Sequence, residues 1–365
     1  MQIGEIINVL ENWAPPVLQE SYDNCGLLTG SLNWECSGVL MCLDATEEVI
    51  MEAKLKSCNL IIAHHPVIFK GLKKITGKTY VERAMINAIK NDIAIYALHT
   101  NLDNIHTGVN AEIAKRLGLI NCRVLQPKSL YLKKLFTFVP ISHIETVRNA
   151  IFNAGGGHIG NYSECSFTNM GEGSFKPEQG TNPFLGIIGK RHVENELKLE
   201  VIFPNWLEAS VINALKAAHP YEEVAYDIVQ LSNEFQAVGS GMIGELAEPM
   251  NETSFLEFLK KQFELKVIRH TILYSQSIQK IAVCGGAGSF LIRTAIAAKA
   301  DVFVTADLKY HEFFDAEGKM ILADIGHWES EQYTIDLIAD FLKTKFPTFT
   351  LLKTEVKTNP VRYFS

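Results

Sequence analysis

The chain has 365 residues, of which 47% are hydrophobic and 21% charged, and its formal net charge is −7. These values describe an ordinary globular protein of two or three domains, and they count against broad binding of nucleic acid through its phosphates. No apolar run reaches membrane-spanning length, and the first residues lack the basic and long apolar regions of a signal peptide, so we expect neither. Seven cysteines are scattered without a C-x-x-C pair, which favours a reduced, cytoplasmic setting.

Helices and strands are predicted to alternate over residues 1–126. The strands are short apolar runs, and the helices show apolar residues at helical spacing or follow a capping residue such as Thr46. This alternation predicts an α/β domain with a mostly parallel sheet. Helices are expected at 3–13, 46–57, 81–90 and 109–117, and strands at 38–44, 59–65 and 93–98.

The predicted strand at 59–65 ends in His64-His65-Pro66. Open α/β sheets bind ligands at the carboxyl ends of their strands, so both rings lie where a site is expected. Neighbouring side chains on a strand point to opposite faces. A turn beginning at Pro66 can bring both rings to one centre or let each ring bind a different metal ion. Taken alone, the pair is as readily one core histidine and one loop histidine.

The pattern changes after about residue 125. A strand–helix–strand order occurs twice there, with a glycine-rich loop between the two copies, and this order predicts a small ferredoxin-like α+β module. We place it as an insert at 127–235, between a first α/β lobe at 1–126 and a second at 236–365. Its expected elements are strands at 135–139, 198–203 and 219–228 and helices at 144–154 and 205–218, with a loop between 158 and 197.

The α/β pattern resumes from Gly239. The glycine-rich stretch at 285–289 is expected to form a tight strand-to-helix turn, with phosphate contact through its N–H groups as the alternative. Asp307 and His311 are expected beside the cleft, where they either support a metal ligand, face a substrate or are purely structural. Strands are expected at 281–284, 301–307, 320–325 and 348–352, and helices from 289 to 298 and from 331 to 345.

The two α/β stretches look like copies of each other. Each contains a strand followed by His-x-x-x-acid and a helix: His99 with Asp103 in the first stretch, and His327 with Glu331 in the second. We therefore predict two similar lobes that face each other across a pseudo-two-fold axis. The matched pair favours this interpretation over the general likeness of doubly wound units.

Six side chains are expected together at these strand ends. Imidazole and carboxylate ligands suit Zn, the first expectation, and also Fe, Mn, Co or Ni. Since one ion with an open position uses three or four ligands, six candidates fit two ions about 3.5–4 Å apart with a bridging carboxylate. Such a pair makes hydrolysis accessible near neutral pH. The six are His64, His65, His99, Asp103, His327 and Glu331.

His99 has three open roles: a weak ligand, a donor that orients Asp103, or a general base for a bound substrate. We take it as the candidate catalytic residue. Its partner in the second stretch, His327, already supplies a nitrogen.

Six segments resemble the NGG-one-interacting-factor-three-like family, whose bacterial members are often named GTP cyclohydrolase 1 type 2 homologues. Together they span nearly the whole chain outside the insert, and the insert resembles a PII- or CutA-like module, especially at 218–226. His-His-Pro alone is a weak signal, but the ordered set is specific. The segments are 22–27 (YDNCGL), 63–66 (AHHP), 99–103 (HTNLD), 285–289 (GGAGS), 307–311 (DLKYH) and 326–331 (GHWESE).

The resemblance implies a dinuclear metal site with Glu331 as the bridging ligand. It also implies a toroidal homohexamer whose metal sites face an internal cavity that the inserts cap. The implied ligands are His64, His65, Asp103, His327 and Glu331.

Three functions follow as hypotheses. The first is a metal-dependent hydrolase of nucleotides, acting either at C8 of guanine, as a GTP cyclohydrolase does, or at phosphorus. The second is a non-enzymatic metal-binding regulator or scaffold with a ring assembly. The third, a nucleic-acid-associated ring, is opposed by the acidic net charge.

Overall fold

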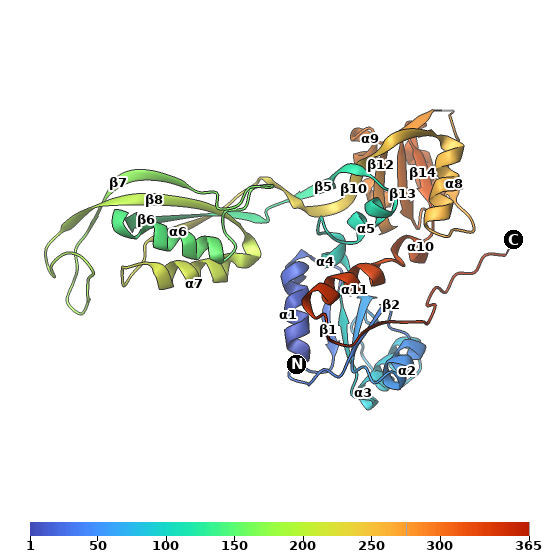
Figure 1. Cartoon of the computed structure of the whole chain (residues 1–365), viewed down its shortest axis with the longest axis horizontal. Coiled ribbons are helices and arrows are strands. Elements are labelled where there is room, and N and C mark those ends of the chain that lie inside the picture. The colour runs from blue at the N-terminus through green and yellow to red at the C-terminus, as the bar shows by residue number, and fades with distance from the viewer. Residues whose placement is uncertain (275, 365) are drawn as a thin grey trace. The chain divides into compact units, whose positions relative to one another are not determined.

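The computed structural model describes residues 1–274 and 276–364 and contains two compact units (Figure 1). The main unit comprises Met1–Pro127 and Ala237–Ser365, and the inserted unit comprises Lys128–Gln236. Over these described residues the architecture is mixed α/β, with three sheets. In the described parts of the chain, no helix is long and apolar enough to cross a membrane.

The first sheet of the main unit has the strand order β1-β4-β3-β2-β15. Strands β4, β3, β2 and β15 run parallel, and β1 is antiparallel to β4. The three central strands are almost entirely buried, as continuous apolar runs in a parallel sheet require. The bounds are β1 Gly26–Thr29, β2 Val39–Asp44, β3 Leu60–His65, β4 Ala94–Ala97 and β15 Leu351–Lys353.

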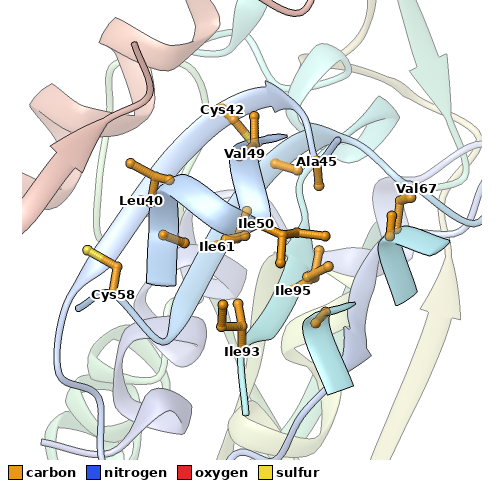
Figure 2. Close-up of a cluster of buried hydrophobic side chains, with 14 of the residues drawn as sticks. Leu40, Cys42, Ala45, Val49, Ile50, Cys58, Ile61, Val67, Ile93 and Ile95 are labelled. Atoms are coloured by element: carbon orange, nitrogen blue, oxygen red, sulfur yellow. The ribbon is translucent and has the colours of Figure 1, made fainter. Parts of the chain in front are cut away.

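One face of this sheet is covered by apolar side chains from the sheet and its helices. Figure 2 shows this cluster, in which Leu40 and Ile61 from the strands lie beside Val49 and Ile50 from α2. All four are completely buried. The packing holds the strand that carries the two histidines.

The second sheet has the strand order β11-β14-β13-β12-β10-β5. Strands β12, β13 and β14 run parallel, and β11 is antiparallel to β14. This repeats the arrangement of β2, β3, β4 and β1 in the first sheet. The bounds are β5 Ile120–Ser129, β10 Glu234–Asn251, β11 Arg269–His270, β12 Ser277–Ala287, β13 Val302–Ala306 and β14 Ile321–Asp324.

The helices of the main unit connect and cover these strands. The hydroxyl of Thr46 accepts a hydrogen bond from the Val49 N–H, so Thr46 caps α2 as its sequence predicts. The bounds are α1 Ile3–Trp13, α2 Glu47–Leu55, α3 Tyr80–Lys90, α4 Thr100–Asp103, α5 Val109–Arg116, α8 Glu252–Gln262, α9 Ile292–Ala297, α10 His327–Glu331 and α11 Thr334–Lys345, with 3-10 turns η1 Pro16–Leu18, η4 Ser289–Leu291 and η5 Tyr310–Ala316.

The inserted unit is an antiparallel sheet with the order β7-β8-β6-β9 and two helices, α6 and α7, on one face (Figure 1). Buried Leu135, Leu199 and Val201 from the sheet pack against Val147 of α6 and Val211 of α7. The bounds are β6 Leu132–Pro140, η2 Ile141–His143, α6 Ile144–Asn153, β7 Phe167–Phe175, β8 His192–Pro204, η3 Asn205–Leu207, α7 Glu208–Ala218 and β9 Tyr226–Gln230.

Three local predictions are wrong. The expected loop at 158–197 contains strand β7, whose glycines and polar residues conceal it because most of its side chains are exposed. The strand expected at 219–228 begins only at Tyr226. The glycine-rich stretch is largely the end of β12, which runs to Ala287, and α9 begins at Ile292. The helix expected at 331–345 is present as α11, and Glu331 itself belongs to the short preceding helix α10.

Gly108, immediately before α5, tests how closely the chain packs between α4 and α5. A Cβ atom at position 108 would overlap the Leu102 carbonyl oxygen. We expect Gly108→Ala to lower the free energy of unfolding by about 1–3 kcal/mol, measured by urea denaturation. Gly71→Ala, where an added Cβ meets nothing within 4 Å, is the control and should change it by less than about 0.5 kcal/mol. Equal effects would contradict the packing argument.

Candidate metal centre

The site residues lie at the carboxyl ends of parallel strands in both sheets of the main unit. His64 and His65 end β3, and Asp103 lies in α4, which follows β4. His327 and Glu331 are the first and last residues of α10, which follows β14. Because five residues separate the start and end of this helix by little more than one turn, both side chains point to the same side.

The Glu331 carboxylate is the centre of the cluster. Its Oε2 lies 3.0 Å from His65 Nε2 and 3.0 Å from His327 Nε2. The same oxygen lies 3.8 Å from His64 Nε2, and that nitrogen lies 3.7 Å from Asp103 Oδ1. The structure thus brings together all five residues of the expected ligand set.

The three imidazole rings are held from their outer sides. Each uses Nδ1 for a hydrogen bond directed away from the cluster, which leaves Nε2 facing inward. This is the arrangement in which outer partners orient metal-binding histidines. The bonds are His64 Nδ1 to the Leu98 carbonyl at 2.8 Å, His65 Nδ1 to Asp44 Oδ1 at 2.8 Å and His327 Nδ1 to Asp307 Oδ2 at 2.7 Å.

Two buried atoms in the cluster have no hydrogen-bond partner within the part of the chain that the structure describes. They are His64 Nε2 and Asp103 Oδ1. Leaving a buried polar atom unsatisfied costs about 1–3 kcal/mol, more for a charged group. A cation shared by this nitrogen and this oxygen would satisfy both, so the residues present fit a metal ion.

Burial and charge shift the pKa values of these groups strongly. Burial lowers the pKa of His64 to about 4, which keeps its ring neutral. Burial also opposes protonation of His65, but hydrogen bonds with Asp44 and Glu331 outweigh it and raise the pKa of His65 to about 9. For His327, the charge of Glu331 and the hydrogen bond with Asp307 outweigh burial and raise the pKa to about 11.

The two carboxyl groups shift in opposite directions. Burial, together with the charge of Glu331, raises the pKa of Asp103 well above its ordinary value. Burial opposes ionisation of Glu331 as well, but the charge of His327 and the hydrogen bonds from the rings hold its pKa well below the ordinary value. Glu331 is therefore the anion around which the rings gather.

His99 lies against the cluster in a setting of its own. Its ring centroid is 5.3 Å from that of His64 and 5.4 Å from that of His65. Its Nδ1 is hydrogen-bonded to Asp23 Oδ1 at 2.8 Å, a role that the sequence, which placed Asp23 only in the family segment 22–27, did not indicate. Among the residues described, two groups of donors suit a metal ion: His64 with His65 and His99, and His65 with His327 and Glu331.

The glycine-rich stretch brings the backbone of β12 against α10. Gly286 has a φ of +61°, and a Cβ atom there would lie 2.5 Å from Glu331 Oε1. Its N–H donates a hydrogen bond to the Ser330 hydroxyl at 3.0 Å. The role of this stretch is thus close approach to the helix that carries Glu331.

Of the two residues expected beside the cleft, only Asp307 reaches the cluster, through its hydrogen bond with His327. His311 lies in η5, where its ring contacts those of Tyr310 and Phe314. Sequence reasoning did not single out Asp44, the partner of His65. Its position at the end of β2, at the same sheet edge as His65, was the available signal.

A cavity of about 450 Å³ lies in front of the cluster. It is lined by His65, His99, Asp103, His327 and Glu331, and by the aromatic rings of Tyr22, Phe69, Tyr80 and Phe290. No Lys or Arg is among its described lining residues, and four of them are Asp or Glu. The donor cluster and the partner of His65 therefore supply three of the four carboxylates of the lining, and exposed aromatic rings form the rim of the cavity.

Comparison with known proteins identifies the family. Residues 1–360 match the family model described as Duf34/NIF3 (NGG1p interacting factor 3). The chain belongs to the DUF34/NIF3 family. It is 44% identical over 327 residues to a protein of Halalkalibacterium halodurans, covering 88% of this chain and 87% of that one, and 42% identical over 313 residues to a protein of Bacillus subtilis, covering 86% and 84%. Both relatives are named GTP cyclohydrolase 1 type 2 homolog.

Solved structures agree with this membership. A Bacillus cereus protein related to NIF3 has a TM-score of 0.89 and 38% identity, with 100% of this chain and 99% of that one covered. A Staphylococcus aureus protein has a TM-score of 0.79 and 28% identity over 100% of this chain and 99% of that one. The family resemblance expected from the six segments is confirmed.

Metal binding to this NIF3-family chain should release protons. Without metal at pH 7, His65 and His327 hold a proton, since their pKa values are about 9 and about 11. A divalent ion needs both rings neutral, so affinity should fall as pH falls from 8 to 6 and at least two protons should leave at pH 7, with any proton held by Asp103, whose pKa is also raised, adding to them. Titration calorimetry in two buffers of different ionisation enthalpy measures this release. His327→Gln should release about one proton fewer, and unchanged release would contradict the assignment.

Asp44, which holds the His65 ring, is itself hydrogen-bonded to Thr358 in the C-terminal segment. The Thr358 hydroxyl donates to Asp44 Oδ2 at 2.5 Å, and Asp44 Oδ1 holds His65. Thr358→Val should weaken Zn²⁺ binding about tenfold in a competition titration, because Asp44 then orients the ring less well. Thr344→Val removes an exposed hydroxyl that donates to the Phe341 carbonyl within α11, away from the cluster, and should have no effect. Equal affinities for both variants would refute this role.

Proposed function

We propose that this chain is a metal-dependent hydrolase that cleaves phosphoester bonds of nucleotides. The observation that carries the proposal is the convergence of three oriented imidazole nitrogens and two carboxylates on the wall of an open cavity. An accessible cavity favours catalysis over a saturated structural site. When bound, two divalent ions would polarise a phosphoryl oxygen and lower the pKa of water.

The donor geometry supports two ions sharing one carboxylate. His64 Nε2 lies 3.7 Å from Asp103 Oδ1, whereas the Nε2 atoms of His65 and His327 each lie 3.0 Å from Glu331 Oε2, and we assign the first pair to one ion and the second pair to the other. Glu331 would bridge them, as the family resemblance implies. Zn²⁺ is the first expectation for this nitrogen and oxygen set, with Fe, Mn, Co and Ni as alternatives.

His99 is proposed as the residue that moves a proton. Asp23 holds its Nδ1, which leaves Nε2 for exchange with a group in the cavity. The ring also contacts Phe69 edge-on, with centroids 5.4 Å apart, so its orientation is held from two sides. A histidine held in this way suits general acid–base work.

The cavity supports reaction at phosphorus over reaction at guanine C8. Its lining includes no Lys or Arg within the described residues, so the counter-charge for phosphate must come from the donor cluster. If C8 lay at the cluster, the triphosphate of GTP would lie away from it, where the described lining offers no Lys or Arg to pair with phosphate. With phosphate at the cluster, the base can instead stack on the aromatic rim, where Tyr22 and Phe290 are more than half exposed.

The remaining expectations belong to the same proposal. We take residues 1–126 and 236–365 as two related lobes across the metal site, since both sheets repeat the same strand arrangement. The βαββαβ order of the inserted unit supports a ferredoxin-like module. A homohexameric ring is proposed on the ground of the resemblance, and a cytoplasmic setting on the ground of the scattered cysteines.

The test is a nucleotide screen with the protein loaded with Zn²⁺ or Mn²⁺. Phosphate release from nucleoside monophosphates is expected, with no formate from GTP. Glu331→Gln should lower turnover by more than about 100-fold, because even outer partners of a metal are worth about 10–100-fold. Glu257→Gln, an exposed change on α8, should leave it unchanged. Bound metal without any turnover would refute the hydrolase and favour a metal-binding regulator.

A further inference from the structure

The inserted unit contains a second cavity, of about 720 Å³. It lies on the face of the sheet opposite the helices. Leu199 and Val201 pack against α6 and α7, so Glu196 and Lys198, which alternate with them along β8, face the other way. Both of these residues line the cavity, together with the loop that joins β7 to β8 and the segment 221–225.

Four aromatic side chains form much of the wall of this cavity: Phe138, Phe175, Phe184 and Tyr221. The Tyr221 ring contacts Phe175 with centroids 5.7 Å apart and Phe184 with centroids 6.4 Å apart. The faces of aromatic rings carry partial negative charge, and these rings are grouped around one cavity. This is the setting that binds organic cations in proteins.

A buried carboxylate lies in the same wall. Glu196 is only 8% exposed, and its described hydrogen bond is from the neutral Tyr221 hydroxyl at 2.7 Å. Gly173 on β7 makes room for it, since a Cβ atom there would overlap the carboxylate. Burial of a carboxylate beside a single neutral donor is costly, and a bound cation would offset that cost.

The two lysines of the cavity are engaged elsewhere. Lys198 pairs with Glu200 at 3.0 Å and lies over the Phe136 ring, 4.3 Å from its centroid. Lys176 pairs with Glu178 at 3.3 Å near the surface. Within the described residues, no ion pair neutralises Glu196, and Glu222 and Glu223 add negative charge to the lining.

The His219-Pro-Tyr-Glu-Glu stretch, which the sequence singles out, builds this wall. His219 is buried, and its Nε2 lies 3.0 Å from the Phe138 carbonyl oxygen. Its Nδ1 accepts a hydrogen bond from the Tyr221 N–H at 3.1 Å. The histidine thereby ties the segment to β6 and positions the Tyr221 ring over the cavity.

We propose that this cavity binds a small organic cation, a substituted ammonium with an apolar body, between the aromatic rings and Glu196. The positive charge of the ligand lies at the Glu196 carboxylate, and the alkyl groups of the ligand lie against Phe175, Phe184 and Tyr221. The site is separate from the metal centre, and it does not depend on the proposed hydrolase activity.

The test compares choline with its uncharged isostere 3,3-dimethyl-1-butanol, titrated into the full-length protein and followed by ligand-observed NMR. Choline should bind saturably and at least about tenfold more tightly than the alcohol. Glu196→Gln keeps the size of the side chain and an acceptor for Tyr221, and it should abolish that preference. Glu145→Gln removes an exposed charge from α6, which lies on the opposite face of the sheet, and should preserve the preference for choline.

Three results would overturn the proposal. The first is no saturable choline binding, the second is equal binding of choline and the alcohol, and the third is an unchanged preference in Glu196→Gln. Circular dichroism and thermal unfolding establish that each variant is folded. Tyr221→Phe provides a second folded test, because it removes only the hydroxyl that holds the carboxylate and should weaken choline binding several-fold.

Discussion

The buried carboxylate of Glu331 is the constraint on which the main unit depends. It lies within 3.0 Å of two imidazole nitrogens and 3.8 Å of a third, although these side chains come from both sheets. An ionised carboxylate at this depth needs positive charge around it. Protonated His65 and His327 supply it in the chain alone, and metal ions would supply it in the loaded protein. The site therefore joins the two halves of the unit electrostatically.

The hydrogen bonds on the outer sides of the three rings fix how the rings are oriented. A ring that donates from Nδ1 to a carbonyl or carboxylate presents Nε2 inward and loses rotational freedom before any ligand arrives. Asp44, Asp307 and the Leu98 carbonyl do this for the three rings. The lining of the cavity has a consequence for the substrate. Outside the donor cluster it offers mainly aromatic groups, with carboxylates and, in the described lining, no Lys or Arg. Anionic substrate groups are then directed to the cluster itself, which is the basis for favouring chemistry at phosphorus.

Much of the fold and of the candidate site could be predicted from residues alone. Apolar runs such as Leu60–His65 are long enough and isolated enough to specify buried parallel strands, and Thr46 specifies a helix start. The repeated His-x-x-x-acid spacing identifies side chains at strand ends, which parallel strands must bring to one edge. The five expected ligands meet for that reason. Strand β7 could not be predicted, since its exposed, glycine-containing sequence has no apolar period.

Only the tertiary structure decided which partner each ring has and what surrounds it. Asp23 and Asp44 are 76 and 21 positions from the histidines they hold, and no local pattern connects them. The sequence of the stretch 285–289 allows a phosphate-binding turn. In the structure, the absence of a side chain at Gly286 makes room for Glu331. The burial of Glu196 beneath Tyr221 likewise follows from packing across strands and loops. Local sequence determines periodicity and end signals, whereas distances between remote side chains exist only once the sheets have packed.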